Sequence, residues 1–388
     1  MRRFPLPIND MQRDACKRAS DAGLPFALWR DPFGRSFTAL ISTTQPENEP
    51  VFGDQTAPGF VMAPFDTEDG SQAWTLPADV VISDDGPLYR DGIALVDHPV
   101  STAQRRITDP AHTPPSALRT PDGESPDPTD RETYMERVSR AVARIRAGDC
   151  DKIVLSRIDP RTLPEDRDLL DLAEGLAELH PHAFVCLVSS GPTGTWLTAT
   201  PEILLANDEN GIRTMALAGT QWPEPETDIA SLTWPQKIID EQALVADYIR
   251  EAFAAEGFED VDETAPYTVR AANLCHLRSD FSAPAGSQEA LGRLLGRLHP
   301  TSAVCGMPKE AARAFIMEEE GPTRRFYTGY LGPRGLNGGT QLYVNLRSAS
   351  ISGNQIFLHV GGGIVEASDP AMEWQETVEK TKTISAVL

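Results

Sequence analysis

Short apolar segments joined by tight turns are the feature that most restricts how this chain folds. The segments AFVCLVSS and TWLTATPEILLA are separated only by the turn GPTG, and IRTMALAGT follows the turn NDENG. So short a turn joins antiparallel neighbours, because a parallel connection needs a crossover of about a dozen residues or more. We therefore expect an antiparallel meander here.

Helical periodicity alternates with these strands. Apolar residues recur at helical spacing from Tyr134 to Ile145, and Gly148 stands where a left-handed C-terminal cap belongs. The strand KIVLSR follows, and further helices are predicted at about 235–255 and 287–298. Near the end of the chain come the strands QLYVNLRSASI and NQIFLHV, a glycine cluster and a last helix. The predicted fold class is α+β with mostly antiparallel sheets.

A segment rich in proline and aspartate interrupts this order at residues 99–130. It contains ITDPAHTPPSALRTPDGESPDPTD and shows no apolar periodicity, which predicts a surface linker or long loop. Residues 1–98 have short, aromatic segments punctuated by glycine and proline, as in a β-rich portion. The candidate functional residues all lie in residues 131–388.

Charge and cysteine content exclude several classes of function. The chain carries 35 Lys and Arg against 57 Asp and Glu, a net charge of −22, which repels nucleic acids and anionic membrane surfaces and favours a monomer. There is no apolar run of about 18 residues and no signal-peptide core behind the two initial arginines, so we expect a cytoplasmic protein without a membrane partner. The five scattered cysteines lack ligand spacing, which predicts buried reduced thiols.

The last helix places three charged side chains on one face. Asp369 is the expected N-cap and Pro370 the first helical residue, and Glu373, Glu376 and Lys380 fall within about 60° of one another. Such a stripe is often an ordinary solvated salt-bridging face. The GGG segment just upstream favours a functional interpretation, because consecutive glycines let backbone N–H groups approach an anion.

Glu241 is an unusual carboxylate. On the segment KIIDEQALVADYIREAF it shares a helical face with Ile238, Val245 and Tyr248. A carboxylate among apolar neighbours is normally paired, protonated or bound to a metal, unless it reaches the surface. If it faced Glu373 and Glu376 across a cleft, oxygen ligands alone would suit Mg²⁺.

Two further residues suit acid–base chemistry. Lys152 opens the strand KIVLSR, and although such lysines commonly protect sheet edges, a lysine desolvated in a cleft has a depressed pKa and can act as a general base. Glu202, just after Pro201, is a candidate carboxylic acid kept protonated by its surroundings.

Three other polar residues are ambiguous from the sequence. His276 and His299 are the first histidines to consider, although a core histidine bonded to backbone is more common than a catalytic one. Arg347 alternates in phase with Tyr343 and Asn345 on its predicted strand, where its guanidinium can bind a carboxylate or form a structural ion pair.

Taken together, the motifs resemble those of the chorismate-utilising enzymes, and most closely those of isochorismate synthases. The resemblance spans roughly residues 130 to 388 and rests on ordered segments, namely DKIVLSR, ATPEILL, MALAGT, CHL, HPTSAVCGMPKEAA, RRFYTGYLGP, LYVNLRSA and GGGIVEASDPAMEWQETVEK. It implies the chorismate-binding fold: two layers of mostly antiparallel sheet, helices outside, and an active site in the cleft. It also implies that residues 1–98 are the variable portion of that fold and residues 131–388 the catalytic one.

The resemblance assigns a role to each candidate residue. Lys152 matches the base that activates water for attack at C2 of chorismate, and Glu202 matches the acid that protonates the departing C4 hydroxyl. Glu241 and Glu376 match the carboxylates that hold Mg²⁺, with Glu373 close by. The substrate pocket is matched by Gly219, Thr220, His276, Arg347, Gly361, Gly362, Gly363 and Lys380.

One departure from the family pattern lies beside Glu241. Many members have histidine after this glutamate, whereas this chain has Gln242, as in some menaquinone-pathway isochorismate synthases. The carboxylate itself is retained, so metal binding is expected to persist.

The motifs leave alternative reactions open. Lys152 favours water over ammonia as nucleophile, and the chain has no glutaminase segment, so no amidotransferase subunit is expected. Water addition gives isochorismate or, with loss of pyruvate, salicylate, and the form of the motifs favours isochorismate and leans toward menaquinone rather than siderophore synthesis. A catalytically silent chorismate-binding protein is disfavoured because the acid, base and metal positions are all present.

Overall fold

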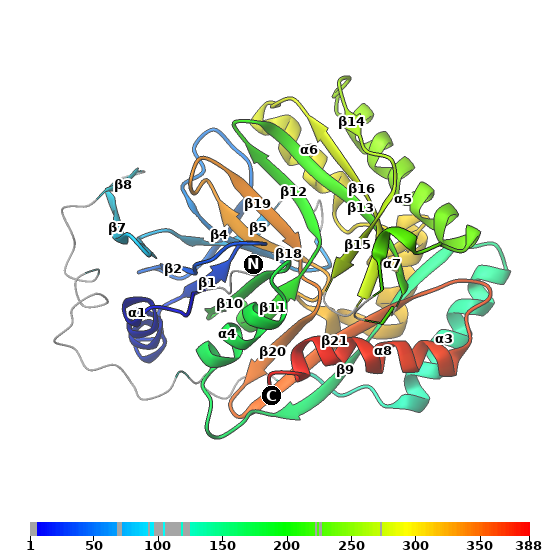
Figure 1. Cartoon of the computed structure of the whole chain (residues 1–388), viewed down its shortest axis with the longest axis horizontal. Coiled ribbons are helices and arrows are strands. Elements are labelled where there is room, and N and C mark those ends of the chain that lie inside the picture. Colours follow the sequence, from blue (N-terminus) through cyan, green and yellow to red (C-terminus); the bar gives the residue numbers. More distant parts are fainter. Residues whose placement is uncertain are drawn as a thin grey trace.

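The computed structural model describes residues 6–67, 72–91, 94–96, 104, 118, 125–221, 223–224, 227–271 and 274–388 (Figure 1). Most of the predicted 99–130 linker lies outside these residues. Gln104 and Leu118 are described as buried, and residues 125–130 form an irregular lead into the helix that begins at Arg131.

Two large, mostly antiparallel sheets form the framework, as the sequence predicted. In spatial order, the first sheet contains β17 (Gly306–Met307), β9 (Lys152–Thr162), β21 (Gln355–Ile364), β20 (Ser348–Ser352), β11 (Gly194–Thr200), β10 (Phe184–Ser190), β1 (Phe26–Arg30), β2 (Thr38–Ile41), β6 (Val80–Ser83), β7 (Gly86–Asp91) and β8 (Ala94–Val96). The second contains β14 (Asp262–Glu263), β16 (Leu274–Ala283), β13 (Gly211–Gln221), β12 (Ile203–Asp208), β19 (Thr340–Val344), β18 (Tyr330–Arg334), β4 (Gly59–Ala63), β5 (Gln72–Pro77) and β3 (Glu47–Pro50), with β15 (Tyr267–Ala271) also paired to β16.

Helices cover the outer faces of both sheets. The helices are α1 (Asp10–Asp21), α3 (Arg131–Arg146), α4 (Leu169–Leu179), α5 (Gln236–Ala255), α6 (Gln288–Leu298), α7 (Lys309–Glu320) and α8 (Pro370–Ser385), with short 3₁₀ turns η1 (Ile229–Ser231) and η2 (Gly321–Arg324). Helices α1 and α4 pack on the first sheet, and α5 and α6 pack on the second. None of the helices in the described ranges is long and apolar enough to cross a lipid bilayer.

The N-terminal portion contributes strands to both sheets. Strands β1, β2 and β6 to β8 extend the first sheet, whereas β3 to β5 form one edge of the second. The sequence predicted the β-rich character of this portion but missed helix α1, where Asn9 and Gln12 form a reciprocal capping box.

Aromatic side chains from both sheets fill the space between them. Phe184 of the first sheet stacks on Tyr343 of the second with ring centroids 4.1 Å apart, and Trp196 is fully buried nearby. A large side chain buried in this way stabilises the fold by about 1.5–3 kcal/mol relative to leaving it exposed. This core holds the two layers together beside the end of the sheets where polar residues gather.

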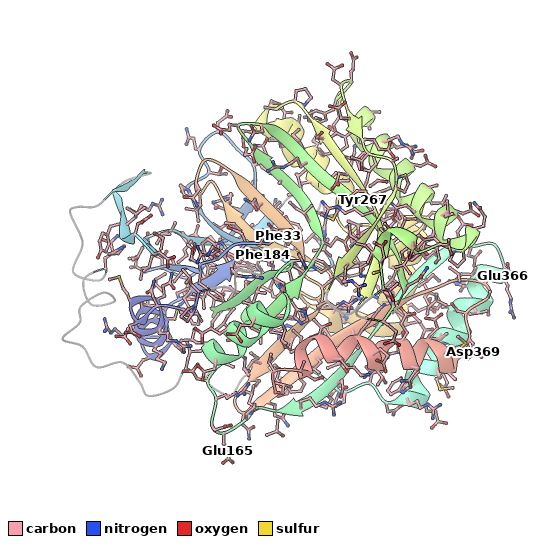
Figure 2. All side chains as sticks on the ribbon, in the orientation of Figure 1. Phe33, Glu165, Phe184, Tyr267, Glu366 and Asp369 are labelled. Atoms are coloured by element: carbon pink, nitrogen blue, oxygen red, sulfur yellow. The ribbon has the colours of Figure 1, made fainter. Side chains whose placement is uncertain are left out.

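The predicted helix ends are confirmed. The side chain of Asp369 accepts hydrogen bonds from the backbone N–H groups of Ala371 and Met372, and Pro370 opens α8. Asp369 and the preceding Glu366 lie at one side of the molecule (Figure 2). After α3, Gly148 has φ +85°, the left-handed conformation that glycine adopts without strain. All five cysteines are buried and free, as expected.

Candidate active site

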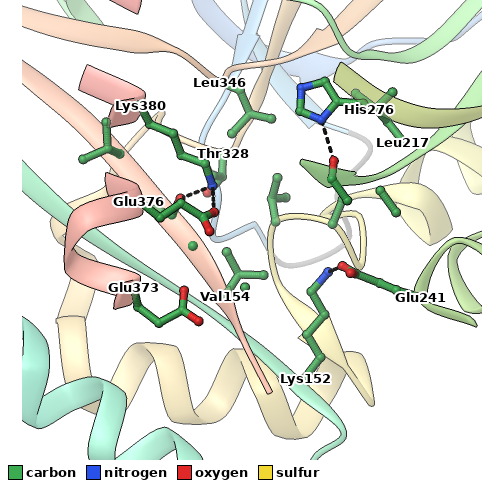
Figure 3. Close-up of a pocket in the computed structure, with 18 of the residues that line it drawn as sticks. Lys152, Val154, Leu217, Glu241, His276, Thr328, Leu346, Glu373, Glu376 and Lys380 are labelled. Atoms are coloured by element: carbon green, nitrogen blue, oxygen red, sulfur yellow. Dashed lines mark hydrogen bonds and ion pairs between the residues drawn. The ribbon is translucent and has the colours of Figure 1, made fainter. Parts of the chain in front are cut away.

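A cavity of about 400 Å³ lies between the two sheets, a size typical of small-molecule sites (roughly 300–1,000 Å³). It brings together residues from β9, β13, β16, β21, α5 and α8 (Figure 3). Twelve predicted site residues line it: Lys152, Glu202, Gly219, Glu241, His276, Arg347, Gly361, Gly362, Gly363, Glu373, Glu376 and Lys380. The side chain of the thirteenth, Thr220, lies outside what the structure describes.

The segment TWLTATPEILLA is not the single strand that the sequence predicted. It divides into β11, in the first sheet, and β12, in the second, and the chain crosses between the layers at Pro201 and Glu202. The proline lacks the N–H that a continuous strand interior would need. The crossing places the Glu202 side chain in the cavity.

The segment LYVNLRSAS also divides where one strand was predicted. It forms β19 and β20 in different sheets, and Arg347 between them has φ +50°, so the expected strand alternation with Tyr343 fails. The two crossings are hydrogen-bonded to each other, because Val344 N donates to the Glu202 carbonyl and Ala199 N donates to the Arg347 carbonyl, each at 3.0 Å. We call these paired crossings the strand corners.

Burial controls the protonation of Glu202. Its side chain is 5% exposed, and desolvation raises the pKa of its carboxyl to about 7, although the positive charge of Lys152 opposes the shift. A protonated fraction therefore persists at neutral pH, which is the state a general acid requires.

Lys152 forms an ion pair with Glu241. The Nζ and Oε1 atoms are 2.5 Å apart, and the two side chains are 13% and 25% exposed (Figure 3). The sequence predicted an uncharged Lys152 and a Glu241 turned toward a metal, whereas the structure pairs the two side chains. A general base must be a free amine, because an ammonium nitrogen has no lone pair.

The opposite side of the cavity carries a second ion pair. Glu376 and Lys380 are 2.6 Å apart on α8, and Lys380 Nζ also donates to the Gly361 carbonyl at 2.9 Å (Figure 3). The nearby Glu373 accepts a hydrogen bond of 2.6 Å from Ser368 Oγ. The predicted charged face of this helix is therefore confirmed as part of the cavity.

The three glycines clear space for charged side chains. They lie within β21, where all three are paired with residues of β9. A Cβ on Gly363 would lie 2.8 Å from Lys152 Cε, and one on Gly362 would lie 3.2 Å from Glu373 Oε2. A Cβ on Gly361 would lie 2.5 Å from the Leu155 carbonyl oxygen, which is too close.

The carboxylates of α8 fit a hard cation. The position of a Cβ on Gly362 is 3.2 Å from Glu373 Oε2 and 3.9 Å from Glu376 Oε1, so both oxygens border one small space. Within the described part of the chain, no group of three or more acidic, histidine or cysteine side chains is close enough to ligate a metal. Mg²⁺ does not require one, because it commonly binds one or two carboxylates and completes its octahedron with water and substrate oxygens.

His276 lines the cavity as a neutral ring. Its Nδ1 is 2.6 Å from the Gly219 carbonyl oxygen, and burial lowers its pKa to about 4. Because Nδ1–H donates to that carbonyl, Nε2 is the acceptor. His276 therefore suits a hydroxyl donor in the substrate pocket that the resemblance implied.

His299 is a core histidine, the more common of the two alternatives. Its Nε2 lies 3.0 Å from the Pro64 carbonyl oxygen, its ring packs edge-on against Tyr330, and it does not line the cavity. Burial lowers its pKa to about 4.

Gly219 and Arg347 are shaped by local backbone. Gly219 has φ +66° at a bulge in β13, and a Cβ there would lie 2.3 Å from the Ile238 side chain. The guanidinium of Arg347 donates to Thr383 Oγ1 of α8 at 3.1 Å, and desolvation lowers its pKa. Other donors on this planar group face the cavity.

The sequence reasoning missed supporting residues around the cavity. Tyr327 and Thr328 line it from the segment FYTGY, and Thr328 has φ +61°. Beneath β9, the buried Arg324 pairs with Glu320 and donates to the carbonyls of Val154 and Val304. The motif RRFYTGYLGP includes Arg324, Tyr327 and Thr328. No individual role for these residues was evident from the sequence, whereas their contacts in the structure show that they support the cavity.

The two-layered α+β fold and the cavity lined by charged side chains between its sheets are those of a small-molecule enzyme. Residues 89–388 match the family described as chorismate binding enzyme, and the chain belongs to this family.

Individual relatives narrow the comparison. The isochorismate synthase EntC of Escherichia coli is 32% identical over 260 residues, which are 66% of this chain and 66% of that protein. The salicylate biosynthesis isochorismate synthase of Pseudomonas aeruginosa is 32% identical over 305 residues, 77% of this chain and 63% of that protein. The structure of MenF, the menaquinone-specific isochorismate synthase of Escherichia coli, matches with a TM-score of 0.79 at 25% identity, covering 99% of this chain and 93% of that one.

Proposed function

We propose that this protein is an isochorismate synthase that converts chorismate to isochorismate by adding water at C2 and removing the C4 hydroxyl. The observation that carries the proposal is the shared cavity of Lys152 and Glu202, in which burial raises the pKa of Glu202 to about 7. A proton donor and a potential proton acceptor on one small-molecule cavity form the pattern of an acid–base enzyme.

Each turnover starts with Lys152 as the free amine and Glu202 as the carboxylic acid, and a proton must return from Lys152 to Glu202 through solvent before the next one begins. Lys152 takes a proton from water as the water oxygen bonds to C2, the ring double bond shifts, and the C4–O bond breaks. Glu202 gives its proton to the departing oxygen, which leaves as water. The substrate and product have the same composition, so the reaction is an isomerisation.

The ion pair with Glu241 restrains the base. Lys152 Nζ lies 2.5 Å from Glu241 Oε1, and it can take a proton from water only as the free amine, because an ammonium nitrogen has no lone pair. Glu373 and Glu376 border one small space and would hold Mg²⁺, whereas Glu241 lines the same cavity as the partner of Lys152. The ion, when bound, neutralises the ring carboxylate of chorismate and fixes the ring for the addition.

Polar residues on the cavity wall suit the remaining groups of chorismate. Arg347 and Lys380 are cations that can bind its carboxylates, and Arg347 is oriented by Thr383. The acceptor nitrogen of His276 suits a ring hydroxyl. Substrate binding thus uses both strand corners and α8.

A relative, the cysteines and the net charge support a pathway, a cellular compartment and an oligomeric state for the proposed enzyme. The likeness to the menaquinone-specific enzyme over nearly the whole chain supports menaquinone synthesis, and the buried, free thiols suit the cytoplasm. The strongly acidic surface supports a monomer.

Product identification tests the proposal directly. The purified protein is incubated with chorismate and Mg²⁺, and the products are separated by chromatography. We expect isochorismate as the main product. Salicylate with an equal amount of pyruvate would establish the lyase alternative, anthranilate formed with added ammonium would establish an aminating enzyme, and unchanged chorismate would overturn the proposal.

A further inference from the structure

A second cavity meets the active site behind Lys152. It has a volume of about 330 Å³, and three residues line both cavities: Lys152, Glu241 and Val365. The Lys152–Glu241 ion pair therefore lies between two spaces, one that holds the predicted substrate residues and one that does not. We call the second space the side groove.

The loop after α6 forms another part of the wall between the active-site cavity and the side groove. Ala303 and Val304 line the active-site cavity, whereas Ser302 lines the side groove. Ser302 is 2% exposed, and its hydroxyl has no hydrogen-bond partner in the protein. A buried hydroxyl without a partner is costly, and a water molecule is the smallest ligand that satisfies it.

The side groove opens to solvent at its other end. Leu244 and Asp240 of α5 are exposed at its rim, whereas Val245 and Ser302 are buried inside it. Its lining combines the apolar side chains of Leu244, Val245, Met307 and Val365 with polar residues that include Asp151, Gln236 and Asp240. A water molecule entering from solvent can thus reach the buried Ser302 hydroxyl, which has no protein partner and lies in the same groove as Lys152.

The proposed reaction needs water to move while the ring is bound. Each turnover takes up one water at C2 and releases one at C4, so a single opening filled by the substrate would hinder the exchange. We propose that the side groove supplies the water that attacks C2, with Ser302 as the positioning residue that holds it beside Lys152. This inference rests on the proposed isochorismate synthase activity.

Filling the side groove tests the route. Leu244→Trp places an indole at the rim, and Ile239→Trp is the matched control, because Ile239 lies on the same helix, is 40% exposed against 47% for Leu244, and lies outside both linings. We expect Leu244→Trp to lower kcat by at least about tenfold, with the KM for chorismate, Mg²⁺ affinity and melting temperature unchanged. Ile239→Trp should match the wild type in all four.

Other results from this pair count against the route. Full kcat in Leu244→Trp, with a crystal structure showing the indole in the groove, would overturn it. So would a fall in kcat matched by equal losses in KM or Mg²⁺ affinity, which would indicate a distorted substrate site. The wild-type protein in the same assay tests the proposed function separately, since absence of isochorismate there concerns the reaction and not the groove.

The role of Ser302 has its own test. Ser302→Ala removes the hydroxyl, and we expect a several-fold lower kcat with unchanged KM, whereas Ser302→Thr restores the hydroxyl and should recover most of the rate. A crystal structure of the wild type should show an ordered water on Ser302 Oγ that is absent from Ser302→Ala. Equal rates in Ser302→Ala and wild type, or no water at Ser302, would overturn this role.

Discussion

Two lysine–glutamate pairs stand on opposite sides of the cavity, and the chain makes them in different ways. Glu376 and Lys380 are one helical turn apart on α8, with the glutamate toward the N-terminus, the favourable order for such a pair. Lys152 and Glu241 are 89 residues apart and meet only through the fold. We call these two sides the α8 wall and the α5 wall.

The surroundings of the two pairs differ as well. The α8 wall has Glu373 in addition to its ion pair, so its carboxylates outnumber its lysine, and the wall favours a cation. The α5 wall has one lysine and one carboxylate, and Lys152 is the charged group that influences the nearby Glu202. In the proposed mechanism, the α8 wall binds and neutralises charge while the α5 wall moves protons.

The largest expected effect comes from removing the base of the α5 wall. Lys152→Ala should lower kcat by on the order of 10²-fold, because general base catalysis contributes about this much, while Mg²⁺ affinity stays close to that of the wild type. Steady-state kinetics and calorimetry measure the two quantities. Lys382→Ala, at an exposed residue of α8 paired with Glu379, is the control and should change neither. A Lys152→Ala enzyme with normal kcat would remove Lys152 from the mechanism.

A metal titration tests the α8 wall. Glu376→Ala should weaken Mg²⁺ binding by at least about tenfold, because it removes one of the two carboxylates that border the space above Gly362. Isothermal calorimetry without substrate measures this directly. Glu379→Ala is the control. Glu379 lies about one helical turn from Glu376 and is bonded to Lys382 and Gln375, so this variant should bind Mg²⁺ normally. Equal Mg²⁺ affinity in Glu376→Ala and Glu379→Ala would contradict the division between the walls.

The pH dependence of kcat/KM tests Glu202 as the general acid. Burial raises the pKa of Glu202 to about 7, so the proton that the general acid must donate is lost as the pH rises through that value. We therefore expect kcat/KM to fall on the alkaline side with an apparent pKa near 7, up to about tenfold per pH unit beyond it. In Glu202→Gln, the residual activity should lack this limb. A limb that persists in Glu202→Gln belongs to another group.

Single methyl groups give the smallest and most selective effects. Gly363→Ala brings a Cβ to 2.8 Å from Lys152 Cε and should lower kcat several-fold, whereas Gly362→Ala meets Glu373 at 3.2 Å and should chiefly weaken Mg²⁺ binding. The same kinetic and calorimetric measurements compare them. Gly292→Ala, in helix α6 with nothing within 4 Å of the new Cβ, should leave both unchanged. If both cavity variants changed the same quantity, the two walls would not be functionally distinct.

The sequence predicted the α8 wall because its information is local. Helical periodicity alone placed Glu373, Glu376 and Lys380 on one face, and the cap residues fixed where α8 begins. Periodicity also found the apolar neighbours of Glu241, but the partner of Glu241 is a strand residue far away in the sequence. No spacing rule predicts such a contact, because it depends on how the two sheets are placed.

The strand corners show the same limit in a different way. A continuous apolar pattern predicted one uninterrupted strand through Glu202 and another through Arg347, because both halves of each segment are buried in one sheet or the other. Pro201 was a local signal for the first corner. The sequence held no comparable local signal for the second corner, because Arg347 adopts a positive φ that its residue type rarely takes.

The strand corners also limit how this molecule can open. At the strand corners, two neighbouring segments run continuously from one sheet into the other. They are also hydrogen-bonded to each other, so together they tie the two sheets. Movement of one sheet past the other would have to disrupt both strand corners at once. Access to the cavity therefore depends on the elements outside the strand corners, among them α5 and α8, which carry Glu241 and Glu376.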